Sequence, residues 1–483
     1  MNKSMVFKIT GIILQIEAFL LLLPAIVSLI YREFGIVWVF LISAALAAIT
    51  GSLLRLVFRP KNSLIYAREG LVIVALCWVA MSLFGCLPFF ISREIPNFVD
   101  AFFETVSGFT TTGASILTNV EALSHGIVFW RSFTHWIGGM GVLVFVTAVI
   151  PNMSDRSIHI IKAEMPGPIV GKLVPRVKDT SRMLYLIYIV MTLVQIVFLL
   201  CGGVNLFDSA VLSFGTAGTG GFSMKSDSVA SFSPYVQWVI TVFMLMFGIN
   251  FNLYYLCIIR RFRSALKSEE LWVYLAVVLT ATVIIAFNIH TSMPETSTLS
   301  ETVRHSAFQV SSIITTTGYG TIDLNALPNL SKAILFILML TGACAGSTAG
   351  GLKISRVVIL FKTIRRECQR LIHPRSVKAI KFEGKALDHV TRHGVATYFA
   401  IYMICILTVF LLLSIDKMSF ETNITATVST FNNVGPFFGY AGAAGSYADY
   451  SSFSKLVLSF ALLMGRLEIY PMLLASSLGT WKK

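Results

Sequence analysis

The chain has 483 residues, of which 55% are hydrophobic and only 13% are charged. Ordinary soluble domains carry about 25% charged residues, and the apolar content is too high for a disordered or collagen-like chain. The formal net charge of +14 is a poor sign of nucleic-acid binding, because little polar surface is left to carry such a site. The composition instead indicates a membrane protein.

Apolar stretches long enough to cross about 30 Å of hydrocarbon recur along the chain. No small-residue cleavage site follows the first stretch, so we interpret it as a retained span and not as a signal peptide. We predict an all-α polytopic membrane protein with ten transmembrane helices. The predicted spans cover residues 9–31, 36–57, 70–92, 126–150, 183–204, 234–259, 271–290, 331–360, 393–415 and 453–480.

Basic residues gather on one side of these predicted spans. If the N-terminus is cytoplasmic and the chain alternates sides, the cytoplasmic segments hold 29 of the 38 Lys and Arg residues. The positive-inside rule then places both termini in the cytoplasm, and acidic residues predominate on the outer face. Eleven of the basic residues lie in 353–392, which leaves open whether this segment also docks a cytoplasmic partner.

Four shorter apolar segments lie between spans, and each ends near a glycine. The four glycines recur at intervals of 108, 97 and 117 residues. After two N-terminal spans, the chain therefore repeats one pattern of span, short segment and span four times, as channels and transporters do. The short segments cover 97–111, 206–219, 298–316 and 418–433. We divide the chain into an N-terminal two-helix unit and four repeats at 1–65, 66–155, 156–268, 269–385 and 386–483.

The glycine loops predict a cation site on the axis of the repeats. Irregular backbone at membrane depth persists only where it is buried in protein or lines a watery cavity. Glycine permits positive φ, so successive carbonyls can point towards one axis, and rings of carbonyls can replace the hydration shell of a monovalent cation. The partly negative C-terminal end of each short helix would also favour a cation.

At these residues the sequence resembles the Trk/Ktr/HKT superfamily of potassium transporters, and within it the bacterial TrkH (TrkG) membrane subunits. The resemblance covers essentially the whole chain, and 316–320 also resembles the filter of tetrameric potassium channels. It implies that Gly113, Gly221, Gly318 and Gly435 are filter glycines around one central pore. The predicted selectivity filter comprises Thr111, Thr112, Gly113, Thr219, Gly220, Gly221, Thr316, Thr317, Gly318, Tyr319, Asn433, Val434 and Gly435.

The first filter glycine bears on ion preference. Related proteins with Ser at this position tend towards sodium, so the resemblance implies potassium selectivity for a chain with Gly113. The second and fourth loops depart from the TVGYG pattern, which implies fewer well-formed sites. We therefore expect K⁺ and Rb⁺ to be accepted and Na⁺ to be accepted weakly.

A glycine-rich interruption at 342–351 falls inside the predicted span 331–360. Such a run forms a poor helix, and in TrkH-like proteins this position is an intramembrane loop that acts as the gate. Close helix packing through small residues is the alternative. The predicted gate comprises Gly342, Ala343, Gly346, Ser347, Gly350, Gly351 and Arg466.

Arg466 lies within the last predicted span, where a charge is costly and usually functional. The resemblance implies that it points into the pore beneath the filter and forms an electrostatic barrier to cations. An ion pair with Glu468 or another buried acid is the alternative, although residues two apart do not share a helix face.

Other polar residues are less informative. Glu104 and the pair Arg304-His305 belong to short segments, where they either brace the filter or are helix-end charges. We interpret His135 as packing at a helix interface and not as a metal ligand. The sequence contains no CxxC pair, GxGxxG, P-loop or triad spacing, so we expect neither a structural zinc site nor an enzyme.

We interpret the chain as a potassium uptake protein of the bacterial inner membrane, in which K⁺ gathers at an acidic outer mouth and crosses a channel-like pore. The alternative is a Na⁺- or H⁺-coupled symporter that works by alternating access. The longest predicted cytoplasmic segment, 353–392, is too short for a nucleotide-binding domain. The resemblance implies a separate TrkA-type subunit that binds the nucleotide, and a homodimer in the lipid bilayer.

Overall fold

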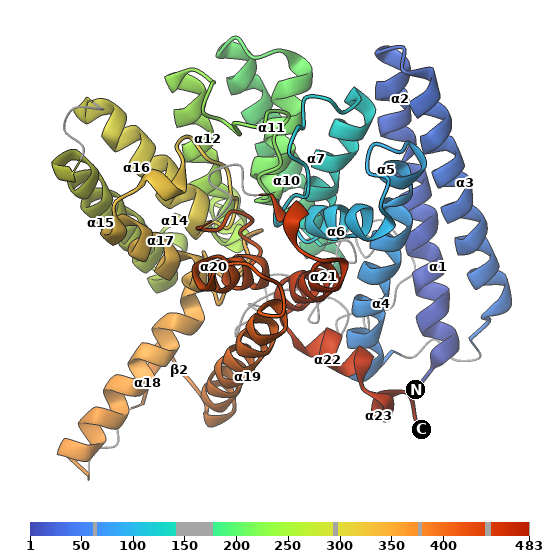
Figure 1. Ribbon diagram of the computed structural model, residues 1–483. Coiled ribbons are helices and arrows are strands. Elements are labelled where there is room, and N and C mark those ends of the chain that lie inside the picture. The colour runs from blue at the N-terminus through green and yellow to red at the C-terminus, as the bar shows by residue number, and fades with distance from the viewer. Residues whose placement is uncertain (61–64, 142–176, 293–297, 375–378, 440–445, 483) are drawn as a thin grey trace.

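The computed structural model describes residues 1–60, 65–141, 177–292, 298–374, 379–439 and 446–482. This part of the chain is a bundle of helices (Figure 1), apart from one short antiparallel pair of strands, β1 (Lys381–Phe382) and β2 (Lys385–Ala386). A predominantly helical chain agrees with the all-α prediction.

Three N-terminal helices form one edge of the bundle: α1 (Lys3–Leu20), α2 (Leu22–Ile30) and α3 (Phe34–Val57), blue in Figure 1. Helices α1 and α3 cross at two glycines, Gly11 and Gly51. A Cβ on either glycine would lie 2.6 Å from the carbonyl oxygen of the other, so no larger residue fits this crossing. Small residues at helix crossings are a common means of close packing in membranes.

Six helical segments are long and apolar enough to cross a membrane within the described residues, which confirms six of the ten predicted spans. Their outward faces carry large exposed apolar side chains such as Leu279, Phe287 and Leu411, as a lipid-facing surface requires. The six segments are Lys3–Ile30, Phe34–Val57, Ala67–Ile91, Ser181–Cys201, Glu269–Ser292 and His389–Leu413. In Figure 1 they include α4 (Ala67–Gly85), α5 (Leu87–Ile91), α10 (Val177–Cys201), α15 (Glu269–Ser292) and α19 (His389–Leu413).

Three other predicted spans are not continuous helices, and for the span at 331–360 the sequence predicted such an interruption. The span at 234–259 is bent by 88° between two helices. The span at 331–360 is interrupted by a loop from Gly342 to Lys353, and the span at 453–480 breaks after Arg466. The helices concerned are α12 (Pro234–Phe247), α13 (Phe251–Ile258), α17 (Asn329–Thr341), α18 (Ile354–Ile372), α21 (Ser452–Arg466), α22 (Tyr470–Ser476) and α23 (Leu478–Trp481).

The predicted span at 126–150 begins as α7 (His125–Gly139), and its residues beyond 141 lie outside the described part of the chain. Helices α7, α12, α17 and α21 are similar in length, with 15, 14, 13 and 15 residues. Each follows one of the glycine loops and ends at or beside a glycine. All four therefore stop at a corresponding point of the chain.

The four short segments form buried helices: α6 (Phe98–Phe109), α11 (Leu206–Gly218), α16 (Leu299–Ile314) and α20 (Phe420–Phe431). Each begins at a residue whose side chain accepts a hydrogen bond from a backbone N–H of the first turn, which satisfies donors that a helix start leaves open. The capping residues are Asn97, Asn205, Thr298 and Ser419.

Helix α18 projects away from the bundle (Figure 1). The start of α1 and the helix α23 lie on the same side of the bundle as this projection. A short connecting helix, α14 (Phe262–Leu266), precedes α15. The basic residues of α18 thus lie towards the side on which the chain starts and α23 ends.

Candidate functional site

Each short helix leads into a loop with the same unusual backbone. The residue two positions before each glycine has positive φ, at Thr111, Thr219, Thr316 and Asn433, with φ between 55° and 58°. The glycine itself is also positive, at 77°, 74°, 84° and 101° for Gly113, Gly221, Gly318 and Gly435. Non-glycine residues rarely adopt such φ values. The recurrence of positive φ at four corresponding positions therefore indicates one backbone conformation shared by all four loops.

The four loops meet in a closed ring. A Cβ on Gly113 would lie 2.0 Å from the carbonyl oxygen of Gly220 in the second loop, and a Cβ on Gly221 would lie 2.0 Å from that of Thr317 in the third. The third loop meets the fourth in the same way, because a Cβ on Gly318 would lie 2.2 Å from the Val434 carbonyl oxygen. The fourth meets the first, because a Cβ on Gly435 would lie 2.4 Å from the Thr112 carbonyl oxygen. Each glycine therefore makes room for a carbonyl of the next loop.

Backbone hydrogen bonds hold every loop to the end of its own helix in one pattern. The residue two before the glycine donates its N–H to the carbonyl three residues back, and the next residue donates to the carbonyl five back. In the first loop these bonds are Thr111 to Gly108 at 3.0 Å and Thr112 to Ser107 at 2.9 Å. The corresponding bonds from Thr219, Gly220, Thr316, Thr317, Asn433 and Val434 measure 2.8–3.1 Å.

Side chains connect the loops behind the ring. The Tyr319 hydroxyl donates to the carbonyls of Leu212 at 3.1 Å or Phe222 at 3.2 Å in the second repeat. The Asn433 amide donates to the Thr112 hydroxyl at 3.0 Å. The structure thus brings together every residue predicted for the filter, although the Tyr319 side chain lies behind the ring.

Most of the residues that support the loops were not predictable from the sequence. Helix α7 places Arg131 against Glu104 of α6, with Nε 2.7 Å from Oε1, and both side chains are buried. Glu104 also accepts hydrogen bonds from the Ser115 hydroxyl and the Ile116 N–H. Of the two interpretations offered for Glu104, the brace is the one that these contacts support. No local pattern marked Arg131, because its partner lies 27 residues away.

One cavity at the ring contains all four glycines in its wall. Its charged lining consists of Arg131 and Lys225, among the residues that the structure describes. Glu121 lies nearby on the rim, where hydrogen bonds from Ser226 lower the pKa of this carboxyl below its ordinary value. An acidic group is thus present beside the cavity, whose described lining residues include no acid.

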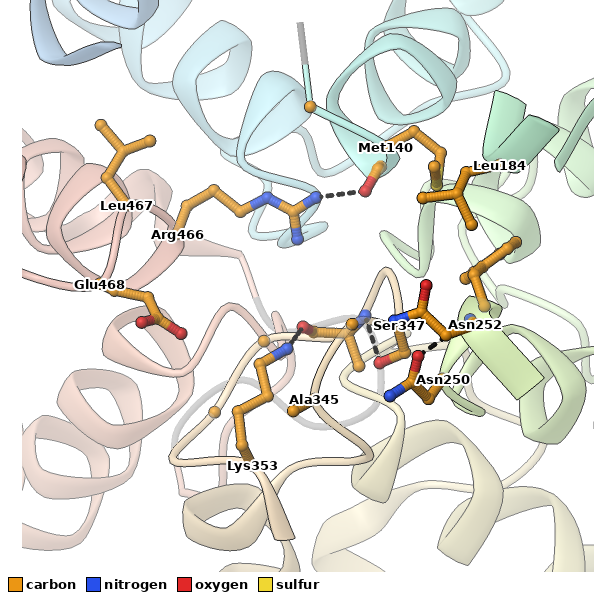
Figure 2. Close-up of a pocket in the computed structure, with 18 of the residues that line it drawn as sticks. Met140, Leu184, Asn250, Asn252, Ala345, Ser347, Lys353, Arg466, Leu467 and Glu468 are labelled. Carbon is orange, nitrogen blue, oxygen red and sulfur yellow. Dashed lines mark hydrogen bonds between the residues drawn. The ribbon is translucent and has the colours of Figure 1, made fainter. Parts of the chain in front are cut away.

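A second cavity lies where α7, α12, α17 and α21 end. Its wall includes 139–141 after α7, 250–252 after α12, much of 345–353 after α17 and 465–468 at the end of α21. Figure 2 shows Arg466 and Lys353 reaching into this cavity from different elements. Five of the seven predicted gate residues line this cavity together with residues at the ends of α7 and α12; Gly342 and Ala343 do not line it.

The loop from Gly342 to Lys353 is tied to its surroundings by backbone groups. Gly350 donates its N–H to the hydroxyl of Thr316 in the third loop at 2.7 Å. A Cβ on Gly350 would lie 2.4 Å from the carbonyl oxygen of Asn432, which places the loop directly against the ring. Ala345 donates to the carboxylate of Glu270 at 2.7 Å, and Lys353 Nζ bonds the Ala349 carbonyl.

The remaining predicted gate glycines permit turns within this loop. Gly342, Gly346 and Gly351 all have positive φ, between 70° and 78°. The small residues Ala343 and Ser347 are buried, and the Gly346 carbonyl accepts the Phe251 N–H at 3.0 Å. Helix packing through small residues alone does not describe this irregular backbone.

Arg466 donates hydrogen bonds to three backbone carbonyls: Thr348 in the loop at 2.7 Å, and Gly138 and Gly139 at the end of α7 at 2.6 and 2.7 Å. Glu468 pairs instead with Arg356, with 2.5 Å between NH2 and Oε2. These contacts favour a role of Arg466 in holding carbonyls and pair the carboxylate of Glu468 with a different arginine. Arg466 joins the loop to a different repeat.

Comparison with known proteins shows the family. The family model described as "TrkH: Cation transport protein" matches residues 37–480. The chain is 33% identical to the Trk system potassium uptake protein TrkH of Salmonella typhimurium and 32% identical to TrkG of Escherichia coli, with full coverage of each chain. It is also similar to the crystal structure of the potassium transporter TrkH from Vibrio parahaemolyticus, at 30% identity, a TM-score of 0.88 and full coverage of both chains. The chain belongs to the TrkH family of cation transport proteins.

Proposed function

We propose that the chain takes up potassium ions across the bacterial inner membrane through a channel-like pore at the ring of four loops. The closed ring is the observation that carries this proposal: carbonyls of Thr112, Gly220, Thr317 and Val434 each face a glycine of a neighbouring loop. Rings of carbonyl dipoles can replace the hydration shell of a monovalent cation. Relatives that match the full length are named potassium uptake proteins, which supports K⁺ as the transported ion.

In this proposal the chain consists of a flanking N-terminal unit and four pore repeats. Their boundaries are 1–65 for the unit and 66–155, 156–268, 269–385 and 386–483 for the repeats. The repeated φ pattern and the repeated backbone hydrogen bonds support this division. The filter comprises the loop residues from Thr111 to Gly113, Thr219 to Gly221, Thr316 to Tyr319 and Asn433 to Gly435.

The loop of residues 342–351, together with Arg466, is the gate in this proposal. Its position supports the role, because Gly350 lies against Thr316 and Asn432 at the inner end of the ring. Glycines with positive φ allow the loop to rearrange with little steric hindrance. The guanidinium of Arg466 adds a positive charge beside the path, which opposes a cation until the loop and the arginine move.

Orientation and partners follow from the charge distribution and from the family. We propose that both termini are cytoplasmic, that two chains form a homodimer with one pore each, and that a TrkA-type cytoplasmic subunit regulates the gate through a nucleotide. The basic segment 353–392 is the proposed docking surface. Inward flux of K⁺ needs no second ion, because the membrane potential supplies about 2.3 kcal/mol per charge for each 100 mV.

Uptake of radioactive Rb⁺ into proteoliposomes tests the proposal. We expect K⁺ to compete with Rb⁺ much better than Na⁺ does, and empty liposomes to take up neither. Equal competition by the two ions would overturn potassium selectivity. We do not favour a symporter that alternates access, and bilayer recording separates the two: unitary currents support the pore, whereas strict dependence on Na⁺ or H⁺ would refute it.

A further inference from the structure

The second loop of the ring lacks two side chains that the other loops have. Gly218 and Gly220 lie three residues and one residue before its filter glycine, where the first and third loops have threonine. In those two loops the threonine hydroxyls bond each other, Thr110 with Thr112 at 2.9 Å and Thr315 with Thr317 at 2.8 Å. The second loop cannot make this bond, so other groups must hold it.

His135 of α7 occupies the space that these side chains would fill. A Cβ on Gly220 would lie 2.3 Å from His135 Nδ1, and a Cβ on Gly218 would lie 2.3 Å from the His135 carbonyl oxygen. The imidazole is fully buried and its centroid is 4.2 Å from that of the Phe222 ring. The two glycines and the histidine are therefore sterically complementary.

The imidazole also links two repeats by hydrogen bonds. Nδ1 lies 2.8 Å from the Gly108 carbonyl oxygen at the end of α6. Because a carbonyl can only accept, Nδ1 carries the proton. The unprotonated Nε2 then accepts the N–H of Phe222, at 3.3 Å. One neutral side chain thus connects the helix of the first loop to the backbone of the second loop, directly after Gly221.

Arg131 makes a parallel link from the same face of α7, one turn earlier. Its NH1 donates to the Ser223 carbonyl at 3.0 Å, and its guanidinium lies 3.5 Å from the centroid of Phe222. Glu104 holds the other side of the guanidinium. Residues four apart share a helix face, so Arg131 and His135 both contact the second loop. Arg131 holds it at Ser223, and His135 holds it beside Gly220.

We propose that His135 is a positioning residue that fixes the second filter loop and thereby supports discrimination of K⁺ from Na⁺, an inference that rests on the proposed function. The carbonyl of Gly220 is the one that faces Gly113, and its place in the ring depends on the support behind it. A loop that is free to shift lets the ring adapt to a smaller ion. Loss of His135 therefore weakens selectivity before it abolishes transport.

The full-length chain in proteoliposomes tests this role through His135→Asn and His135→Ala. The asparagine amide can still donate to Gly108 but is too short to accept from Phe222. We expect His135→Asn to retain Rb⁺ uptake while the preference for K⁺ over Na⁺ as competitor falls by about fivefold or more, since one buried hydrogen bond and its acceptor are lost. We expect His135→Ala to lose more of that preference.

Gly220→Ala tests the same contact from the loop side, because its methyl would displace the imidazole. We expect it to reduce the preference for K⁺ as His135→Asn does. Trp136→Phe is the matched control: it removes a hydrogen bond of 3.2 Å from α7 to Thr192, away from the ring, and we expect the ion preference of wild type.

The outcomes separate the two proposals. Absence of K⁺-selective uptake in wild type defeats the proposed function itself. A selective wild type with an unchanged ion preference in His135→Asn and Gly220→Ala overturns the positioning role of His135. If His135→Ala does not accumulate in the membrane, His135→Asn and Gly220→Ala decide the question.

Discussion

At the scale of single residues, the ring depends on glycine for two separate reasons. Gly113 needs positive φ, at 77°, and it also faces the Gly220 carbonyl at a distance that leaves no room for a side chain. A side chain at a residue with positive φ strains the backbone and costs about 1–3 kcal/mol of stability. A steric clash, in contrast, displaces the neighbouring loop. Only the clash changes the shape of the ring directly.

Gly113→Ser separates these reasons. We expect the serine Cβ to push the Gly220 carbonyl outwards, so that Na⁺ competes for Rb⁺ uptake more nearly as K⁺ does. Gly203→Ser is the control, since Gly203 has φ of 81° and a Cβ added there would meet no other atom within 4 Å. Gly203→Ser should keep the wild-type preference. The same loss of selectivity in both variants would attribute the effect to backbone strain.

Arg466 carries a positive charge and also donates three hydrogen bonds to carbonyls. Substitutions can separate the effect of the charge on ion flux from the effect of the hydrogen bonds. We expect Arg466→Gln to raise Rb⁺ flux, because the positive charge beside the path is removed. Arg466→Lys keeps the charge but cannot donate to three carbonyls in the same geometry, so we expect it to remain nearer to wild type. Lower or unchanged flux in a well-expressed Arg466→Gln variant would count against the electrostatic barrier.

At the scale of elements, the loop of residues 342–351 contacts the third loop of the ring through a hydrogen bond from Gly350 to Thr316. The corresponding hydroxyl in the first loop, on Thr111, has no hydrogen-bond partner within the described residues. These two threonines have the same backbone conformation, with φ of 55° at each. They therefore form a natural pair for testing contact between loop and filter.

We expect Thr316→Val to raise basal Rb⁺ flux, because the loop loses its acceptor at the ring while the shape of the side chain is kept. Thr111→Val makes the same change in the filter without touching the loop, and we expect its basal flux to stay near that of wild type. Flux assays on both variants in proteoliposomes compare them directly. Equal flux in the two variants would show that this hydrogen bond does not restrain the gate.

At the scale of the whole molecule, the proposed orientation can be tested with native cysteines. Cys201 lies at the end of α10 and Cys368 lies in the projecting helix α18, and both are exposed. With cytoplasmic termini, we expect a membrane-impermeant maleimide to label Cys201 in intact cells and Cys368 only after the inner face is opened. Single-cysteine variants provide the measurement, and the reverse labelling pattern would invert the orientation.

Much of this arrangement could be predicted from the sequence, because hydropathy and glycine spacing are local signals. The uninterrupted span at α15 and the loop at Gly318 were both recognisable in this way. The break between α12 and α13 was not, because Gly248 is a single glycine in a continuous apolar run. The backbone polar groups at this break form hydrogen bonds with the loop of residues 342–351. The Cys344 N–H donates to the Gly248 carbonyl, and the Phe251 N–H donates to the Gly346 carbonyl.

The sequence by itself determined that the chain lies in a membrane, which side is basic, and where four glycine loops occur. These features can be predicted because the length of an apolar run, the charge of a segment and the position of a glycine can each be read from neighbouring residues. Only the tertiary structure decided that the loops close into a ring, that Glu468 pairs with Arg356, and that His135 fills the space beside Gly220. These contacts join residues that are far apart in the chain. Hydrogen bonds and close packing between repeats leave no pattern among neighbouring residues of the sequence.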